Sequence, residues 1–497
     1  MARTERYWQG PARATELATE LTGFRFQMRI WLFPARAVMF VIGVVLLLAV
    51  AFPAQAAMPA GPPPAPLWGL PFVGMLLSIA LFPILAPRFW HRRMAWVAGF
   101  WALALLVPIA AVSGIGASAR AVWSAELHEH LPFVLLLLAL FTAGGGILMR
   151  GGPAGTPVGN SIMLAIGTLL AGVMGTTGAA MVLIHPLLRA NAHRARKRHL
   201  VVFFILLVAN IGGATSPLGD PPLYIGFLQG VPFLWPVQNL LGPMALASAI
   251  LLAVFFALDT YFAAREPPPP VREPFHLRGK FNILLIGVVI AAVLLQGVWH
   301  PDTVTLLGES IGLDSLVSMA VFVVVTLISI RFTPRAVRAG NDFTWAPMEE
   351  VAVLFAAIFI TIGPVMAMLD AGLAGPLAPL LGLTMHADGQ FDPVAMFWLT
   401  GMLSAFLDNA PTYLVFFHLA GGDAAELTGS LNHVLRAISA GAVFFGALTY
   451  IGNAPNMMVR SIAAHRGVKM PGFFVYLGLA GILLLPVFAI VSLVYIR

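Results

Sequence analysis

Two aspartates, Asp220 and Asp408, lie inside apolar stretches that are long enough to cross a membrane. An unpaired charge in the hydrocarbon core is unfavourable by about 2.5 to 10 kcal/mol or more, depending on the scale used. A carboxylate kept in such a place is therefore expected to have a function, and one negative charge suits one Na⁺ or one proton. The sequence predicts that both aspartates bind ions.

Small and polar residues interrupt the apolar stretches at four points, and these points form two matched pairs. The segment 214–222 matches the segment 447–455 at its alanine, hydroxyl, aliphatic, glycine, Asp/Asn and proline positions, with an offset of 233 residues. The same offset takes Thr176 to Asn409. An unwound backbone is tolerated in lipid only where it is buried in protein or lines a cavity. The four interruptions therefore predict one internal binding region.

Each half is expected to build an ion site from its own two interruptions, so that each site receives one aspartate. Hard cations prefer hydroxyl, amide and carbonyl oxygens as the remaining ligands. The first predicted site contains Asp220 with Thr176, Thr177, Thr215 and Ser216. The second predicted site contains Asp408 with Asn409, Thr412, Thr449 and Asn453. No cofactor is expected beyond Na⁺ or H⁺ as the transported or coupling ion.

Two histidines, His185 and His418, are related by the same offset and are candidates for a proton relay. Each lies about nine residues beyond an interruption. That distance places the imidazoles near the membrane surface, where a solvated histidine is the commoner case.

The composition shows what kind of protein holds these residues. Hydrophobic residues make up 59% of the 497 positions, charged residues make up 10%, and the mean hydropathy is +0.90. These values exclude soluble enzymes and nucleic-acid-binding proteins. At roughly 20 apolar residues per crossing, the chain has room for about ten to twelve helices. We predict an all-α polytopic membrane protein without disulfides, since cysteine is absent.

The basic residues predict the topology, because positively charged loops stay in the cytoplasm. Basic residues flank 158–190 on both sides, whereas acidic residues flank 393–420. We therefore expect two re-entrant helical hairpins that enter the membrane from opposite faces. The first predicted transmembrane repeat covers 58–264, with a hairpin at 158–190 and a broken helix at 200–236. A cytoplasmic Pro-rich linker follows at 265–280. The second, inverted repeat covers 281–497, with a hairpin at 393–420 and a broken helix at 430–459.

The N-terminal residues 1–57 allow two interpretations. A short apolar run is followed by Ala54-Gln55-Ala56, which is typical of a signal-peptide cleavage site. The alternative is an uncleaved first transmembrane helix, because this pattern also occurs by chance in alanine-rich chains.

The broken-helix segment from Asn210 to Asp220 resembles the corresponding motif of NhaD-type sodium/proton antiporters, and Leu407-Asp408-Asn409 resembles their second hairpin tip. These antiporters belong to the ion transporter superfamily, together with arsenite, citrate and divalent-anion transporters. The resemblance extends from about residue 65 to the C-terminus. It implies a homodimer with scaffold and transport domains, and ion binding by Asn210, Asp220, Asp408 and Asn409.

The chain also departs from the NhaD-type pattern. Gly175-Thr176 stands where those antiporters carry acidic residues, and Pro221-Pro222 stands where they carry hydroxyl residues. The segment from Gly452 to Asn456 is more similar to the Gly-Thr-Pro-Pro-Asn-like segments of anion symporters. This second resemblance adds Asn456 to the second predicted site.

Charge distinguishes two transport functions. We predict sodium/proton antiport by alternating access, because no Lys or Arg lies within the four interruptions to attract a multivalent anion. The alternative is a Na⁺- or H⁺-coupled transporter of an organic carboxylate such as citrate, since helix N-termini alone can hold a carboxylate.

Other functional classes fit less well. An intramembrane aspartyl protease would resemble G-x-G-D, but Pro217 replaces the first glycine here. Hairpins closed from both faces argue against a channel. We predict a transporter and not an enzyme, in the bacterial inner (cytoplasmic) membrane. Its expected partners are membrane lipids, small inorganic ions, a small carboxylate in the alternative reading, and a second copy of the chain, but not nucleic acid.

Overall fold

The computed structural model describes residues 65–497 apart from 152–154, 269–273, 300 and 387. The expected signal peptide or first helix at 1–57 lies outside the described residues. By length and composition, nine of the described helices could cross a membrane, and three shorter apolar helices accompany them. The protein is a mostly helical integral membrane protein.

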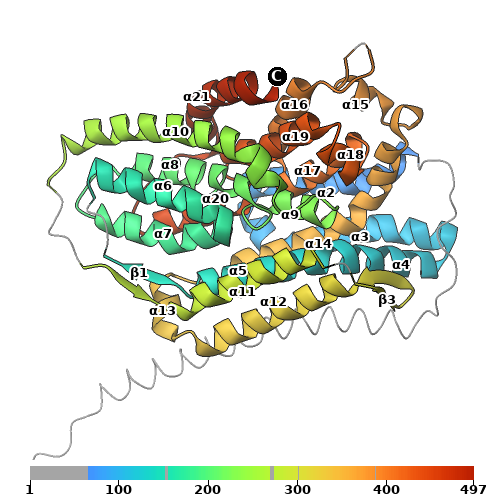
Figure 1. The fold of residues 1–497 in the computed structure, drawn as a ribbon, viewed down its shortest axis with the longest axis horizontal. Coiled ribbons are helices and arrows are strands. Elements are labelled where there is room, and N and C mark those ends of the chain that lie inside the picture. The colour runs from blue at the N-terminus through green and yellow to red at the C-terminus, as the bar shows by residue number, and fades with distance from the viewer. Residues whose placement is uncertain (1–64, 152–154, 269–273, 300, 387) are drawn as a thin grey trace, which may run out of the picture. The chain divides into compact units, whose positions relative to one another are not determined.

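The first half of the described chain alternates long helices with short interruptions (Figure 1). Its elements are η1 (Pro66–Gly69), α2 (Leu70–Leu85), α3 (Pro87–Ser113), α4 (Ile115–Ala125), the π-helix η2 (Glu126–His130), α5 (Leu131–Gly144), β1 (Leu148–Arg150), α6 (Pro157–Met174), α7 (Thr176–Ala190), α8 (Arg198–Leu207), η3 (Ile211–Thr215), α9 (Pro221–Leu228) and α10 (Trp235–Ala263).

The second half ends with the same order of hairpin, broken helix and final helix. Its elements are β2 (His276–Arg278), α11 (Phe281–Gln296), β3 (Thr303–Leu306), β4 (Glu309–Gly312), α12 (Leu313–Phe332), α13 (Arg335–Gly340), α14 (Ala346–Asp370), η4 (Gly372–Ala374), α15 (Ala378–Gly382), α16 (Pro393–Phe406), α17 (Asn409–Leu419), α18 (Ala424–Thr428), α19 (Asn432–Phe445), η5 (Gly446–Leu448), α20 (Ala454–His465), α21 (Phe473–Val491) and the π-helix η6 (Ser492–Ile496).

Proline and capping residues determine where the hairpin helices begin. The Thr156 side chain accepts a hydrogen bond from the Gly159 N–H, and Pro157 opens α6. The Asp392 side chain accepts from two N–H groups at the start of α16, which Pro393 opens. Proline suits the first turn because its missing N–H would be unpaired there anyway.

Two small antiparallel sheets lie outside the helices, and the sequence pattern did not indicate them. Strand β1 pairs with β2, with Leu148 opposite Arg278, so the segment before α6 is joined to the segment before α11. Strand β3 pairs with β4 as a hairpin, with Thr303 opposite Gly312.

Several helices that are far apart in the sequence pack against one another. Helices α5, α11 and α12 contact one another, and Figure 1 shows them side by side. Helix α14 packs against α3 and also contacts α17, while α16 packs along α19. Helix α3 keeps large apolar side chains exposed, including Trp96 at 73% and Val107 at 61%. Such a surface is expected to face lipid or a partner subunit.

The two halves repeat the same local structure at the offset of 233 residues. Helix α7 begins at Thr176 and α17 at Asn409, while α9 begins at Pro221 and α20 at Ala454. The Ser216 hydroxyl donates to the Gly172 carbonyl, and the Thr449 hydroxyl donates to the Ala405 carbonyl, again exactly one offset apart. Each hydroxyl therefore ties a broken helix to the first arm of the hairpin in its own half.

Candidate functional site

Four helix N-termini open onto one small cavity. They are the starts of α7, α9, α17 and α20, and the cavity has a volume of about 50 Å³. Helices α5 and α14 supply its apolar walls, including Phe133, Leu136, Met348 and Phe355. Helix N-termini carry partial positive charge. Their convergence stabilises negatively charged groups, which would otherwise be unfavourable in an apolar environment.

Asp220 lies at the centre of this site and is only 1% exposed. Its Oδ1 accepts hydrogen bonds from Thr176 Oγ1 at 3.2 Å and from Asn453 Nδ2 at 2.9 Å. Its Oδ2 accepts from Asn409 Nδ2 at 2.5 Å. All three donors are neutral, and within the described part of the chain no Lys, Arg or His forms an ion pair with Asp220. A buried carboxylate without a counter-charge favours binding of a proton or a metal cation.

A chain of amides connects the two broken helices. Asn453 Nδ2 also approaches Asn210 Oδ1 at 3.3 Å, and Asn210 Nδ2 donates to Asn456 Oδ1 at 2.7 Å. Asn456 Nδ2 in turn donates to the Gly446 and Thr449 carbonyls at 2.8 Å each. All three asparagines are buried. The broken helices of the two halves therefore meet through side chains, and Asp220 and Asn453, which are equivalent positions, bond to each other directly.

Asp408 lines the same cavity but is half-buried. Its carboxylate caps α17 by accepting from the Ala410 N–H at 3.1 Å. It interacts electrostatically with Glu350 near the start of α14, and also with Asp220. Two carboxylates therefore share one cavity, with a third acid near the second of them.

This geometry differs from the expectation that each half builds a separate site. Asn409 and Asn453 were assigned to the second site, yet both donate to Asp220 of the first. The reason is that the two broken helices and the two hairpin tips meet at the same point, which the linear sequence does not show. The Oδ1 atom of Asn409 is buried and has no hydrogen-bond partner among the described residues. It is therefore a carbonyl oxygen free to coordinate a cation beside Asp220.

The hydroxyl residues divide into two groups. Thr176 donates to Asp220, and the half-buried Thr177 lines the cavity. The others bond mainly to backbone: Thr412 donates to the Asp408 carbonyl at 2.9 Å, while Ser216 and Thr449 hold their hairpins. Thr215 packs against Gly172. Of the predicted hydroxyl ligands, the structure brings Thr176 and Thr177 to the cavity.

Backbone geometry explains one glycine at the first hairpin tip and one in the adjacent broken helix. Gly175 has φ +80°, a left-handed conformation that an L-residue adopts only with strain. A Cβ atom on Gly219 would lie 2.1 Å from the Gly213 carbonyl oxygen. Glycine at 219 therefore allows the broken helix to fold closely on itself, and the Gly219 carbonyl accepts a hydrogen bond from the Thr176 N–H at 2.9 Å. The first tip is thus attached to its broken helix.

The two histidines lie away from the cavity, at opposite ends of α14. His418 Nδ1 is 2.8 Å from Asp370, the last residue of α14. His185 Nδ1 is 3.8 Å from Asp342, which precedes α14, and its Nε2 lies 3.0 Å from the Asn341 carbonyl. Both imidazoles are mostly buried. They contact helix ends and not the two carboxylates of the cavity.

Sequence reasoning missed the contribution of α14 to this site. Glu350, near the start of α14, interacts electrostatically with Asp408 and accepts a hydrogen bond from Trp90 Nε1 at 3.3 Å. The available signal was a pair of acids, Glu349 and Glu350, at the edge of an apolar span. Its position opposite Asp408 depends on packing between distant helices.

The charge of the site decides what it can bind. Asp220 and Asp408 line the cavity, and no Lys, Arg or His is found among its described lining residues. No group of three or more His, Cys, Asp or Glu suited to a transition metal occurs among the residues that the structure describes. The oxygen donors present fit Na⁺ or a proton.

Comparison with known proteins gives one family and several relatives. Residues 64–496 match the profile of a family described as "Putative citrate transport". A 46 kDa membrane protein of Mycobacterium leprae is 23% identical over 389 residues, which cover 76% of this chain and 80% of that protein. An uncharacterized transporter of Mycobacterium tuberculosis is 24% identical over 330 residues, 64% of this chain and 72% of that protein. The Na(+)/H(+) antiporter NhaD of Vibrio parahaemolyticus is 26% identical over 299 residues, 57% of this chain and 68% of the antiporter.

Proposed function

The chain belongs to the citrate transport family and is a membrane transporter, not an enzyme; from this premise we propose that it exchanges Na⁺ for H⁺ by alternating access. The predicted resemblance to the ion transporter superfamily is confirmed by the family match and by the antiporter relative. The exchanged ions are the part that is proposed here.

The observation that carries the proposal is the environment of Asp220. Its carboxylate is buried, receives three hydrogen bonds from neutral side chains of both halves, and has no ion-pair partner among the described residues. An ionised carboxylate in this position needs a cation, and a proton satisfies the same need by neutralising it. Na⁺ and H⁺ therefore compete for one group, which is the requirement for exchange.

The ligands of the bound ion follow from the atoms that face the cavity. Asp220 and Asp408 supply negative charge, and Thr176 and Thr177 supply hydroxyls. Asn409 does not line the cavity, but it is hydrogen-bonded to Asp220, and its buried Oδ1 is an unpaired carbonyl oxygen beside that carboxylate. A volume of about 50 Å³ admits an ion with little water. When the ion leaves, protons on the carboxylates replace its charge, so the empty site does not hold two unpaired negative groups.

Alternating access requires that the site open to each face in turn, and we infer an inverted repeat with two re-entrant hairpins for this purpose. The equal offset between the helix starts and between the Ser216 and Thr449 hydrogen bonds supports two equivalent halves. The opposite charges flanking 158–190 and 393–420 support opposite entry. The hairpin tips would then move with the broken helices to which they are bonded.

Coupled transport of an organic carboxylate such as citrate is the second candidate. The family description favours it, and four helix N-termini can hold a carboxylate without Lys or Arg. The present cavity is unfavourable for it, because pockets that bind small molecules usually measure about 300 Å³ or more and this cavity measures about 50 Å³. In this reading, Asp220 and Asp408 bind the coupling cation.

Two further proposals concern the setting of the transporter. The bacterial inner membrane is the proposed location, with the basic loops in the cytoplasm. A homodimer is the proposed assembly, and the exposed face of α3 is a surface that a second copy could cover.

Flux measurements in proteoliposomes test the function directly. Purified protein is reconstituted with an internal pH indicator, and Na⁺ is added outside with or without citrate. Proton movement driven by Na⁺ in the absence of citrate is the expected result. Na⁺ uptake that appears only when citrate is present would instead establish the carboxylate transporter.

A further inference from the structure

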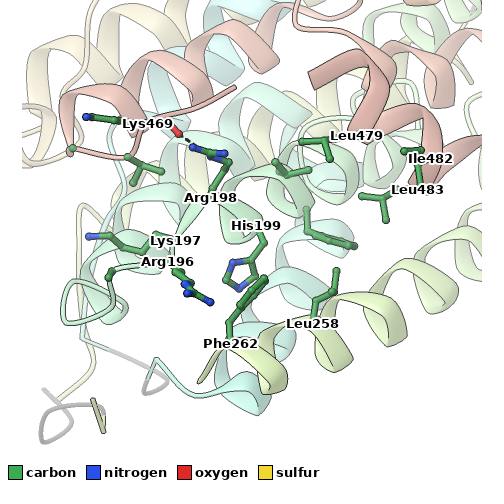
Figure 2. A pocket seen from close by; sticks show the side chains of 15 residues that line it. Arg196, Lys197, Arg198, His199, Leu258, Phe262, Lys469, Leu479, Ile482 and Leu483 are labelled. Carbon is green, nitrogen blue, oxygen red and sulfur yellow. Dashed lines mark hydrogen bonds between the residues drawn. The ribbon is translucent and has the colours of Figure 1, made fainter. Parts of the chain in front are cut away.

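A cavity of about 690 Å³ lies outside the ion site, and none of its lining residues lines the cavity of Asp220 and Asp408. It is formed by the loop before α8, by α8 itself, by the end of α10, by the loop between α20 and α21, and by α21 (Figure 2). The ion site does not explain this cavity, which is roughly fourteen times larger than the one around Asp220.

Basic side chains form one side of this cavity. They are Arg196, Lys197, Arg198 and Lys469, and Figure 2 shows them apart from the aliphatic residues. Lys197 is half-buried and the other three residues are exposed. Arg198 Nε donates to the Lys469 carbonyl at 2.9 Å, which joins the two basic loops. Four positive charges from loops 271 residues apart in sequence therefore gather at one rim.

The nearby acids are already committed to other groups. Glu266 accepts the N–H groups of Ala195 and Arg196 at 2.9 Å each, and these bonds hold the pKa of Glu266 below its ordinary value. Asp259 is buried and bonds to Arg194, His199 and Asn160 behind the cavity. Among the described lining residues there is no Asp or Glu. Glu266 offsets one charge at most, so the rim remains positive.

The opposite wall is apolar and open. Leu479 and Ile482 of α21 are 40% and 75% exposed, and Leu483, Leu258 and Phe203 continue the surface inward. Helices α10 and α21 are both apolar enough to cross the membrane, so this wall is expected to lie at the depth of the acyl chains. A water-filled anion site would not need such a wall, because inorganic phosphate has no apolar part to bury.

We propose that this cavity binds an anionic phospholipid, with its phosphate between Lys197, Arg198 and Lys469 and an acyl chain along Leu479, Ile482 and Leu483. Basic loops mark the face that the sequence predicts to be cytoplasmic. Anionic lipids are enriched in the cytoplasmic leaflet, and basic pockets between transmembrane helices bind their head groups. The lipid would bridge the α8–α10 region to the α20–α21 loop. The proposal does not depend on which ion or carboxylate is transported.

The test compares lipid binding to the full-length protein and to two matched double variants. The site variant is Lys197→Gln/Lys469→Gln, because neither lysine side chain takes part in a described hydrogen bond. The control is Arg331→Gln/Arg335→Gln, which removes two exposed charges from the end of α12 and the start of α13. Phosphatidylglycerol, phosphatidylcholine and inorganic phosphate are the probes, bound lipids are counted by native mass spectrometry, and melting without lipid checks that each variant is folded.

Phosphatidylglycerol is expected to remain bound and to raise the melting temperature, whereas phosphatidylcholine and phosphate are not. The site variant should bind phosphatidylglycerol about 30-fold more weakly, given about 1 kcal/mol for each basic residue at the membrane surface, and the control should bind as the unmodified protein does. Equal retention of both lipids, equal loss in both variants, or protection by inorganic phosphate alone would each overturn the proposal.

Discussion

The two halves of the transporter have matching helix starts at an offset of 233 residues but place their carboxylates differently. In the first half the aspartate lies on the broken helix, at Asp220, and the hairpin tip carries Gly175. In the second half the broken helix carries Asn453 and the hairpin tip carries Asp408. Asp220 is buried and receives three side-chain hydrogen bonds, whereas Asp408 is half-buried and caps its own helix.

This difference indicates that the aspartates have unequal roles. Asp220 accepts from Asn409 and Asn453, so a residue of the first half is bound by residues of the second. Asp408 lines the same cavity as residues of α14 and adds a second negative charge to it. Asn453 donates a hydrogen bond to Asp220, which is its equivalent position in the first half. The two halves therefore contact each other at a position that is a carboxylate in one half and a neutral amide in the other. A single asymmetric site therefore describes the geometry better than two equivalent ones.

The largest effect is expected from Asp220→Asn. Asparagine has the same shape but removes the charge that we propose binds the cation in a low-dielectric site. Coupled flux should fall about 100-fold or more, which corresponds to roughly 3 kcal/mol for a buried charge that loses its partner. Flux in proteoliposomes measures this, and the melting temperature checks folding. Normal Na⁺- and pH-dependent flux would show that Asp220 is structural and would favour the carboxylate transporter.

A smaller loss is expected from Asp408→Asn. Asparagine caps a helix as well as aspartate does, so stability should persist while the cation loses about 2 kcal/mol of attraction, or about 30-fold in flux. Asp392→Asn is the matched control, because Asp392 caps α16 in the same way and does not line the cavity. Counting bound ions distinguishes one shared site from two independent sites. One ion bound to each single variant and none to the double variant would support two independent sites.

Exchanging the two equivalent residues tests whether the position of the charge matters. Asp220→Asn/Asn453→Asp keeps one carboxylate and one amide across the 2.9 Å hydrogen bond. We expect this double variant to transport about 10-fold faster than Asp220→Asn, since residues in direct contact are strongly coupled. If it transports no faster, the hydrogen bonds of Thr176 and Asn409 make position 220 the required one.

Two glycines of the first hairpin, Gly175 and Gly178, should differ in their tolerance of a side chain. Gly175→Ala places a Cβ at φ +80° and 3.2 Å from the Leu218 carbonyl oxygen, which should destabilise the protein by about 1 to 2 kcal/mol. Gly178→Ala is the control, because its Cβ would meet only ordinary contacts at 3.6 Å or more. Denaturant unfolding in micelles measures both. Equal stability would mean that the first tip relaxes to another conformation.

The smallest effect is expected from single cysteines that report topology. Ala192→Cys, Pro268→Cys and Gly389→Cys lie at exposed positions in a chain without native cysteine, so flux should not change. An impermeant thiol reagent should label Gly389→Cys in intact cells and leave the other two unlabelled. Labelling of Ala192→Cys from outside would contradict opposite entry of the two hairpins.

The sequence predicted the polar residues of the site better than their grouping. Thr176, Asp220, Asp408, Asn409 and Asn453 were recognisable because polar groups are rare and unfavourable in apolar stretches. Their distribution between two sites was not, because it depends on how the broken helices cross. Ser216 and Thr449 illustrate the same limit: they were predicted as ligands, but their hydroxyls hold the hairpins.

The sequence by itself determined the class of the protein and the positions of its interruptions. Hydropathy, the 233-residue offset and the motif around Asp220 can all be read from the linear sequence. Polar residues are informative there because they are rare in stretches that cross a membrane. Only the tertiary structure decided that Asp220 is bound by both halves, that Glu350 interacts electrostatically with Asp408, and that distant basic loops meet at Lys197 and Lys469. These contacts join residues far apart in the chain, and helix packing creates them without leaving a periodic signal in the sequence.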